Sequence, residues 1–210
     1  MILNFQLLTT KYLGKGFDLS DILIKEPPSD EVKKNWFNPT AEFDHKVKMG
    51  HKQDLDNIED FGTKHWASED GGKLAAILIC DQFSRQIYRK SPMAFAFDPL
   101  ALELTQDMIA KDEIKDYPIH QRIFVAMPLM HSENTKHTES LIELADGWLK
   151  FAEMNNTGEE GEIQQFLFYA QKHLDILKEF GRYPHRNNAL HRESTADEIK
   201  YLETADTFGQ

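Results

Sequence analysis

The sequence predicts an all-α protein of about seven helices joined by short connections. Apolar residues recur at helical spacing along most of the chain from residue 41 onward. No segment keeps the strict alternation of apolar and polar residues that is typical of a half-buried strand. Short stretches rich in glycine, proline and asparagine separate the helical segments. We therefore expect helices throughout, without a sheet.

The amino-terminal part of the chain is the least regular. We interpret residues 1–35 as an irregular arm, because KEPPSDEVKKN (25–35) combines two prolines with mixed charges. Residues 36–210 are expected to form one helical domain, which is an ordinary size for a single core. Its first helix is predicted from residue 41, although Gly50 weakens the pattern.

The second predicted helix is KLAAILICDQFSRQIYRK (73–90). Its first half is apolar on all sides, which a buried strand would also explain, but its length and its Leu-Ala-Ala start favour a buried helix. The next helix is predicted to begin at Asp98 as N-cap, with Pro99 at the first helical position. Another is predicted over IHQRIFVAMPLM (119–130), ended or kinked at Pro128.

The carboxyl-terminal half predicts a pair of long helices and a short one. Ser132 can cap the first, whose apolar stripe includes Trp148, and NNTGEEG (155–161) separates it from the second. Gly181 stands where the second helix should end. Thr195 and Glu198 match the capping box of a last helix.

Composition excludes several classes of function. The chain has 24 basic and 35 acidic residues, a formal net charge of −11, so non-specific binding to nucleic acid or to an anionic membrane surface is disfavoured. We find no convincing signal peptide and no apolar run long enough to span a bilayer. The lone Cys80 lies in an apolar run and is interpreted as a buried side chain in a reducing compartment, rather than as a nucleophile. We expect a cytoplasmic protein.

Five of the six arginines lie in two short segments of a chain that otherwise uses lysine. In the first segment, Asp81, Arg85 and Arg89 follow one another at intervals of four residues, which places them on one helical face. Because this helix is predicted to be buried, the arginines need partners. The partners could be acids such as Asp81 and Asp98, or a bound anion.

The second segment is GRYPHRNNALHR (181–192), between two predicted helices. Arg182, Arg186 and Arg192 offer planar forks that suit phosphate or carboxylate, and Asn187 adds further donors. We interpret the arginines of both segments, with Asn187, as candidate ligands of a small anion. The alternative is a buried network of arginines and acids that ties the loop to the helices.

PLMHSE (128–133) supplies the candidate groups for proton transfer. His131 and Glu133, with His185 from the loop, could act as general acid and base near neutral pH. His173 is expected to orient them. The spacing of these histidines matches zinc sites only weakly, so neither a metal nor another cofactor is predicted. Helix capping by Glu133 and an ordinary, partly buried His131 are the simpler explanation. Whether the protein is an enzyme stays open.

Taken together, several segments resemble the bacterial domain-of-unknown-function family 924. The segments are LAAILICDQFSRQIYRKSPMAFAFDPLAL, FVAMPLMHSE and FGRYPHRNNALHRESTADEIKYL, with WF at 36–37 and FD at 43–44. The resemblance covers roughly residues 36–203. It implies an all-helical fold in an antiparallel, tetratricopeptide-like array or bundle, although no 34-residue repeat is visible in the sequence. It implies no reaction.

Motif residues of that family fall here on the candidates named above. They also fall on Gln82, Phe83, Tyr88, Ser132, Gly181, Pro184, Ser194 and Thr195. Three positions depart from the family pattern. Ser84 and Gln86 stand in place of proline and asparagine, which loosens the geometry beside Arg85. His191 stands in place of glycine, which puts a tight contact between backbone and ligand in doubt.

Two functions follow as hypotheses. The first is a site for a small anionic or phosphorylated ligand, which could include enzymatic activity on such a substrate. The second is a tetratricopeptide-like module that binds a protein partner, in which the arginines only brace the fold. In the second case an exposed apolar or charged groove should lie elsewhere on the helices.

Overall fold

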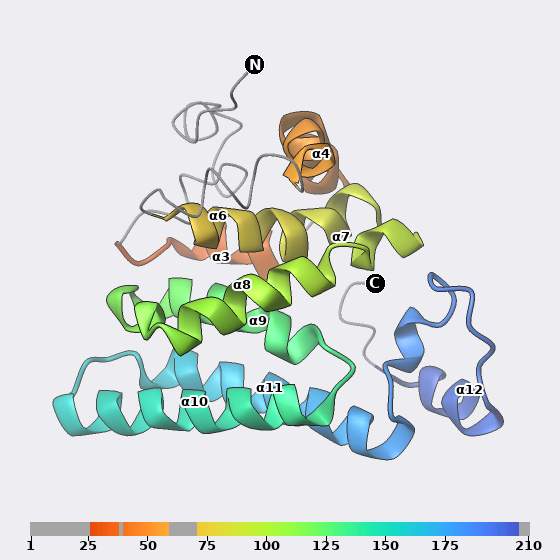
Figure 1. The fold of residues 1–210 in the computed structure, drawn as a ribbon. Helices are drawn as coiled ribbons and strands as arrows, with labels where there is room; N and C mark the ends of the chain where they lie inside the picture. Colours follow the sequence, from red (N-terminus) through yellow and green to blue (C-terminus); the bar gives the residue numbers. More distant parts are fainter. Residues whose placement is uncertain (1–25, 38–39, 59–70, 206–210) are drawn as a thin grey trace. The chain divides into compact units, whose positions relative to one another are not determined.

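A computed structural model describes residues 26–37, 40–58 and 71–205 (Figure 1). The chain divides into two compact units, residues 1–125 and 126–210, and each is described by itself. All regular elements in the described ranges are helical, which confirms the all-α class. The tetratricopeptide-like arrangement and the single domain over residues 36–210 stay predictions.

The first unit contains short helices around one long buried segment. Its elements are α3 (Asp30–Phe37), α4 (Ala41–Asp56), α6 (Gly72–Ile77), a π-helix (Leu78–Phe83), α7 (Ser84–Ile87), α8 (Asp98–Ala110) and most of α9 (Ile119–His131). α4 packs against α7 and against the π-helix, while α6 packs against α8. The predicted start of α4 is confirmed, and Thr40 caps it by accepting from Phe43 N.

Two expectations for this unit were wrong at the level of single elements. α3 begins at Asp30, inside the segment expected to be a loop, because Ser29 accepts from the next turn and Asp30 and Glu31 suit a helix amino terminus. Asp98 is not an N-cap: Phe97 precedes α8, Pro99 lies in its first turn, and the Asp98 carboxylate contacts Arg85 instead. Both oxygens of Asp98 accept from Arg85, at 2.9 and 3.0 Å.

The predicted buried helix over residues 73–90 is confirmed only in part. Residues 74–81 are all fully buried, Cys80 among them, but the middle of the segment is a π-helix. Its wider turn is seen where Ser84 N donates to Ile79 O, five residues back. An apolar run that is buried on every side has no polar face to reveal its period, so the sequence could not show this turn.

α9 continues through Pro128 to His131, so of the two predicted alternatives, an end or a kink at the proline, the end is wrong. Proline removes one backbone donor, but Ser132 N still donates to Pro128 O at 3.1 Å, so the turn after the proline is retained. The next helix is capped by Asn134, whose side chain accepts from Lys136 N, and not by Ser132. Ser132 instead contacts Nδ1 of His137.

The second unit is built on a long helical hairpin. α10 (Thr135–Asn155) and α11 (Glu160–Phe180) lie side by side in opposite directions, and Trp148 stacks on Phe166 between them (Figure 1). A 3₁₀ turn (Pro184–Arg186) and α12 (Ala196–Leu202) follow. The predicted caps are confirmed: Gly181 ends α11 with a φ of 70°, and Thr195 and Glu198 form a capping box.

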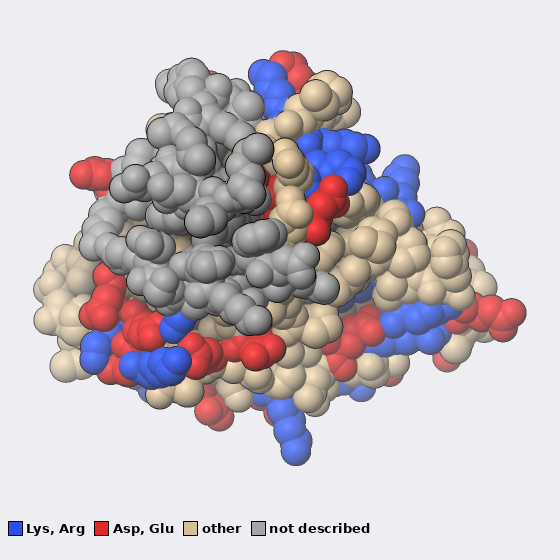
Figure 2. Space-filling view, turned by 45° about the horizontal axis from the view of Figure 1, so that its top comes forward, with Lys and Arg blue, Asp and Glu red and all other residues tan. Residues whose placement is uncertain are grey.

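Charges of both signs share the surface. On the face drawn in Figure 2, lysines and arginines are interspersed with acids rather than gathered in one basic field. Among the helices in the described ranges, none combines the length and apolar character that a bilayer span needs.

Candidate functional site

The arginine loop of the second unit is fixed to α12 by Glu198. Arg182 donates from Nε and Nη2 to the two oxygens of Glu198 at 2.6 and 2.8 Å. The same carboxylate accepts from Asn187 Nδ2 and from Thr195 N. These donors, with Arg182 the strongest, lower the pKa of Glu198 to about 2. Glu198 is therefore ionised at neutral pH.

A second two-point ion pair, between Arg192 and Glu133, joins the loop to the segment just before α10. Arg192 donates to both oxygens of Glu133 at 2.7 and 2.9 Å, and Tyr183 N donates to the same carboxylate at 2.8 Å. Arg192 also reaches Asn187 Oδ1 and Tyr183 O. Burial alone would raise the pKa of Glu133, but these donors outweigh it and the pKa lies below its ordinary value.

Tyr183 lies at the centre of an aromatic and cationic cluster. Its ring stacks on His185 and meets His173 edge-on, each at 5.4 Å between centroids. The Arg186 guanidinium lies 4.7 Å from the ring centroid, and the hydroxyl donates to Met130 O. His131 lies beside His173, with 6.4 Å between the rings. The loop is thus bound to α9 and α11 through one fully buried tyrosine.

This cluster changes the acid–base properties of its members. Burial, followed by the nearby charge of Arg186, lowers the pKa of His185 to about 3. Burial raises the pKa of the Tyr183 hydroxyl. At neutral pH His185 is therefore a neutral imidazole, and Glu133 is an ionised carboxylate already bonded to Arg192. Neither state suits a proton donor that works near pH 7.

The arginines of the first unit form an inner network. Arg85, 7% exposed, donates to both oxygens of Asp98 at 2.9 and 3.0 Å, and its Nη2 lies 3.6 Å from Asp81. Burial acts to lower the pKa of Arg85, but the two carboxylates outweigh it and the pKa is raised. The guanidinium also lies 5.4 Å from the ring of Phe95.

Arg89 lies beyond the end of α7, so the predicted common face with Asp81 and Arg85 does not extend to it. It donates to both oxygens of Asp44 on α4, each at 2.8 Å. Four arginines therefore use the same two-point contact with one carboxylate each. They are Arg85, Arg89, Arg182 and Arg192.

The second unit brings most of the predicted candidates together. They are His131, Glu133, His173, Arg182, His185, Arg186, Asn187 and Arg192. Arg85, Arg89, Asp81 and Asp98 belong to the network of the first unit. Within the part of the chain that the structure describes, no group of three or more His, Cys, Asp or Glu is arranged to hold a metal ion.

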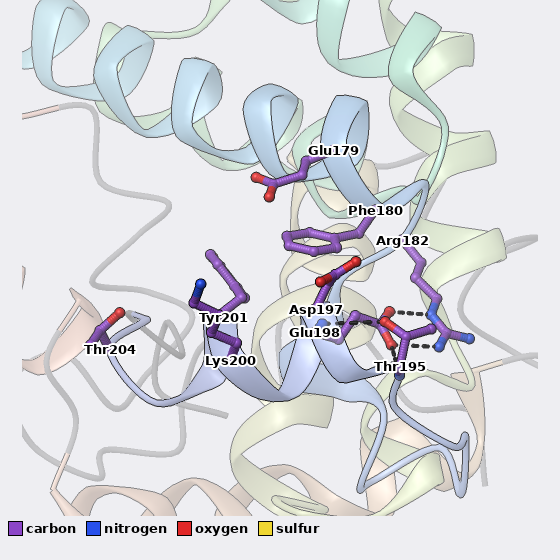
Figure 3. Close-up of a pocket in the computed structure, with 9 residues that line it drawn as sticks. All are labelled: Glu179, Phe180, Arg182, Thr195, Asp197, Glu198, Lys200, Tyr201 and Thr204. Atoms are coloured by element: carbon purple, nitrogen blue, oxygen red, sulfur yellow. Dashed lines mark hydrogen bonds and ion pairs between the residues drawn. The ribbon is translucent and has the colours of Figure 1, made fainter.

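Two features escaped the sequence analysis. His51 and Asp54 form a fully buried pair on α4, 3.1 Å apart, with His51 also packed on Phe83. A groove lies between the end of α11 and α12, where Phe180 and Tyr201 approach one another (Figure 3). The i, i+3 spacing of His51 and Asp54 could have indicated the pair, whereas the groove combines residues of two helices and has no signature in the sequence.

Comparisons with known proteins agree with the fold. The sequence matches the family described as "Bacterial protein of unknown function (DUF924)" over residues 17–206. A solved structure of a protein of unknown function from Agrobacterium tumefaciens is similar, with 27% sequence identity and a TM-score of 0.70. The similarity covers 82% of this chain and 90% of that one. Among curated proteins, none matches this chain.

Proposed function

Because the chain belongs to the DUF924 family of bacterial proteins of unknown function, we propose a function from its geometry: it is a helical interaction module. The α10–α11 hairpin binds a helical segment of a protein partner, and the arginines brace the fold. The observation that carries this proposal is a set of large apolar side chains left exposed on the hairpin. They are Phe151 (60% exposed), Met154 (82%), Phe168 (58%) and Tyr169 (38%).

The exposed residues are grouped by helical spacing. Gly147, Phe151 and Met154 follow at intervals of four and three on α10, and they share one face. On this face Gly147 and Phe151 directly precede the buried Trp148 and Ala152. On α11, Tyr169 directly precedes the buried Ala170. Since the helices are antiparallel, residues so placed lie on the same side of the hairpin. Phe168 does not have this spacing, and its link to the group is the contact of its ring with that of Tyr169, 5.6 Å between the centroids. Clustered apolar surface of this kind is typical of an interaction site.

Gly147 supports a close approach to this face. A glycine in the middle of an exposed helix destabilises it by roughly 1 kcal/mol relative to alanine. A Cβ at this position would meet no atom within 4 Å, so packing within the chain does not require glycine here. The bare backbone one turn before Phe151 leaves room for a partner chain.

Charge favours a basic partner over a second copy of this chain. The exposed charged residues of α10 include four acids and two lysines. They are Glu139, Glu143, Asp146 and Glu153, with Lys136 and Lys150. Two copies, each with a net charge of −11, would repel one another. The segment that fits is an amphipathic helix with an apolar face and basic flanks.

The contacts of the arginines favour a structural role, in which they hold the helices together, over binding of an anionic ligand. A guanidinium whose fork is filled by a carboxylate has to break that contact before it can hold an anionic ligand. Four of the five candidate arginines are in this state. Arg85 connects α7 to α8, and Arg89 connects the segment after α7 to α4. Arg182 and Arg192 connect the loop to α12 and to the segment before α10.

A photo-crosslinking amino acid at position 151 or 168 tests the proposal. The captured protein is identified, purified and titrated against the full chain by fluorescence anisotropy. We expect F151S combined with F168S to weaken its binding at least about tenfold, since losing two apolar anchors exceeds roughly 1.4 kcal/mol. M49S replaces an equally exposed side chain on α4, 73% exposed, and should bind normally.

Three results would contradict the hairpin as the binding surface: no crosslink at either position, a crosslink only to a second copy of the chain, or an equal loss with M49S.

A small-anion site at Arg186 and His185 is a second candidate. The observation that favours it is the positive environment of His185, whose pKa is lowered by Arg186, His173 and Arg192 in addition to burial. Inorganic phosphate, followed by the His185 imidazole signals in NMR, is the probe. A saturable shift that R186K abolishes would support the site, because lysine keeps the charge and loses the fork. An unchanged response in R186K would exclude it.

A further inference from the structure

A groove of about 840 Å³ lies between the carboxyl end of α11 and α12 (Figure 3). Its walls belong to the second unit. They include Glu179, Phe180, Arg182, Asp197, Glu198 and Tyr201. The groove adjoins the arginine loop, so the charge inside it decides which ligand it can take.

The arginine of the groove does not attract an anion. Arg182 contacts both oxygens of Glu198 and also donates to Glu193 O at 2.8 Å. Glu198 is held as a carboxylate by these contacts and by Thr195 N. The pair is neutral as a whole. The loop that is richest in arginine therefore gives this groove no net positive charge.

The remaining charges at the groove are mostly acidic. Glu179 on α11 and Asp197 on α12 are exposed, and neither forms an ion pair with another described residue. Lys200 is the one further basic residue in the lining. Figure 3 shows Glu179 and Asp197 projecting from the two helices that border the groove. Two carboxylates and one lysine leave one negative charge, in a chain that is already acidic.

Two aromatic rings form the wall between these carboxylates. Phe180 and Tyr201 lie 5.0 Å apart with an angle of 50° between their planes. Both rings pack from behind against Ile176, Leu177 and Tyr183, which holds them in place. An aromatic ring attracts a cation to its face, and nearby carboxylates add to that attraction.

We propose that this groove binds an organic cation, an alkylammonium or guanidinium group, against the wall formed by the Phe180 and Tyr201 rings, with Glu179 and Asp197 as its counter-charges. The two sources of such a group are a lysine or arginine side chain of a protein and a free polyamine. This site is separate from the exposed face of the hairpin, and its occupation requires no partner there.

Calorimetric titration of the full chain tests the proposal. The probes are spermidine, an acetylated lysine-containing tripeptide amide and N-acetyl-arginine amide, with N-acetyl-citrulline amide as the neutral isostere. We expect saturable binding of the cations and at least fivefold weaker binding of the citrulline compound. E179Q combined with D197N should weaken cation binding at least fivefold, and Y201L about two- to fivefold, the contribution of one exposed cation–π contact.

The matched control removes the same charge elsewhere. E103Q combined with D116N takes two exposed carboxylates from the first unit and should change the affinity less than twofold. Tighter binding of spermidine would identify a free polyamine as the source, and tighter binding of the peptide a protein side chain. Equal binding of citrulline, an equal loss in the control variant, or no binding of any cation at 10 mM (roughly the weakest affinity of interest) would overturn the proposal.

Discussion

The two arginine networks use the same chemistry in different surroundings. In the first unit, Arg85 is closed off from water, and the Asp81 side chain beside it is completely buried. In the second unit, the side chains of Arg182 and Arg192 keep 29% and 23% of their surface exposed. The cost of an unpaired charge depends on access to water. The same two-point contact should therefore contribute more to stability at Arg85 than at Arg182 or Arg192, or at Arg89 of the first unit, whose side chain is 26% exposed.

The largest effect is expected from R85M. This change leaves the fully buried Asp81, and Asp98 with 21% of its side chain exposed, without their cation, and we expect it to lower the free energy of unfolding by about 3–5 kcal/mol. Urea denaturation followed by circular dichroism measures the loss. R85K keeps the charge and should recover part of it. If R85M cost less than about 1 kcal/mol, burial would not be what distinguishes the two networks.

A smaller effect is expected from R192Q. Glu133 is 27% exposed at its side chain and keeps the Tyr183 N–H, so water and the backbone replace part of the lost contact. We expect a loss of about 1–2 kcal/mol in the same denaturation experiment. A loss as large as that of R85M would show that the loop is as dependent on its charge pair as the buried network is.

A third expected effect is a dependence of stability on pH at Glu198. Its pKa is lowered to about 2 in the folded chain, so the carboxylate takes up its proton at a lower pH than it does in the unfolded chain. The stabilisation is then complete above about pH 4.5, the ordinary value, and is lost as the pH falls toward 2. We expect the wild type to lose more stability than E198Q between pH 5 and 3. Parallel curves for the two proteins would contradict this assignment.

The sequence predicted best what depends on neighbouring residues. The Gly181 cap and the capping box of Thr195 and Glu198 are local backbone contacts, and both are present. The sequence predicted side-chain contacts less well where a residue distant in the chain binds the same group. Asp98 has the position of an N-cap, but Arg85, thirteen residues earlier, holds its carboxylate.

The candidate site shows the same limit. Clustering of arginines indicated the segments that form ion-pair networks, and a network of arginines and acids was one of the two predicted alternatives. The carboxylates that fill the forks were harder to find, because they lie 16, 45 and 59 residues away for Arg182, Arg89 and Arg192. No spacing rule relates residues so far apart, and their pairing depends on the packing of whole helices.

The π-helix at Leu78–Phe83 also sets the rotational phase of everything that follows it. A π turn holds more residues than an α turn, so it shifts the side chains after it around the helix axis. If the same six residues formed an ordinary α-helix, each later side chain would be turned by about 100° around the axis, because a π turn takes up about one more residue than an α turn. The helix would survive and Arg85 would point away from Asp98. Removing one residue together with the π turn would keep Arg85 in phase with Asp98, so relatives with an α-helix here should retain the buried ion pair only where they are one residue shorter.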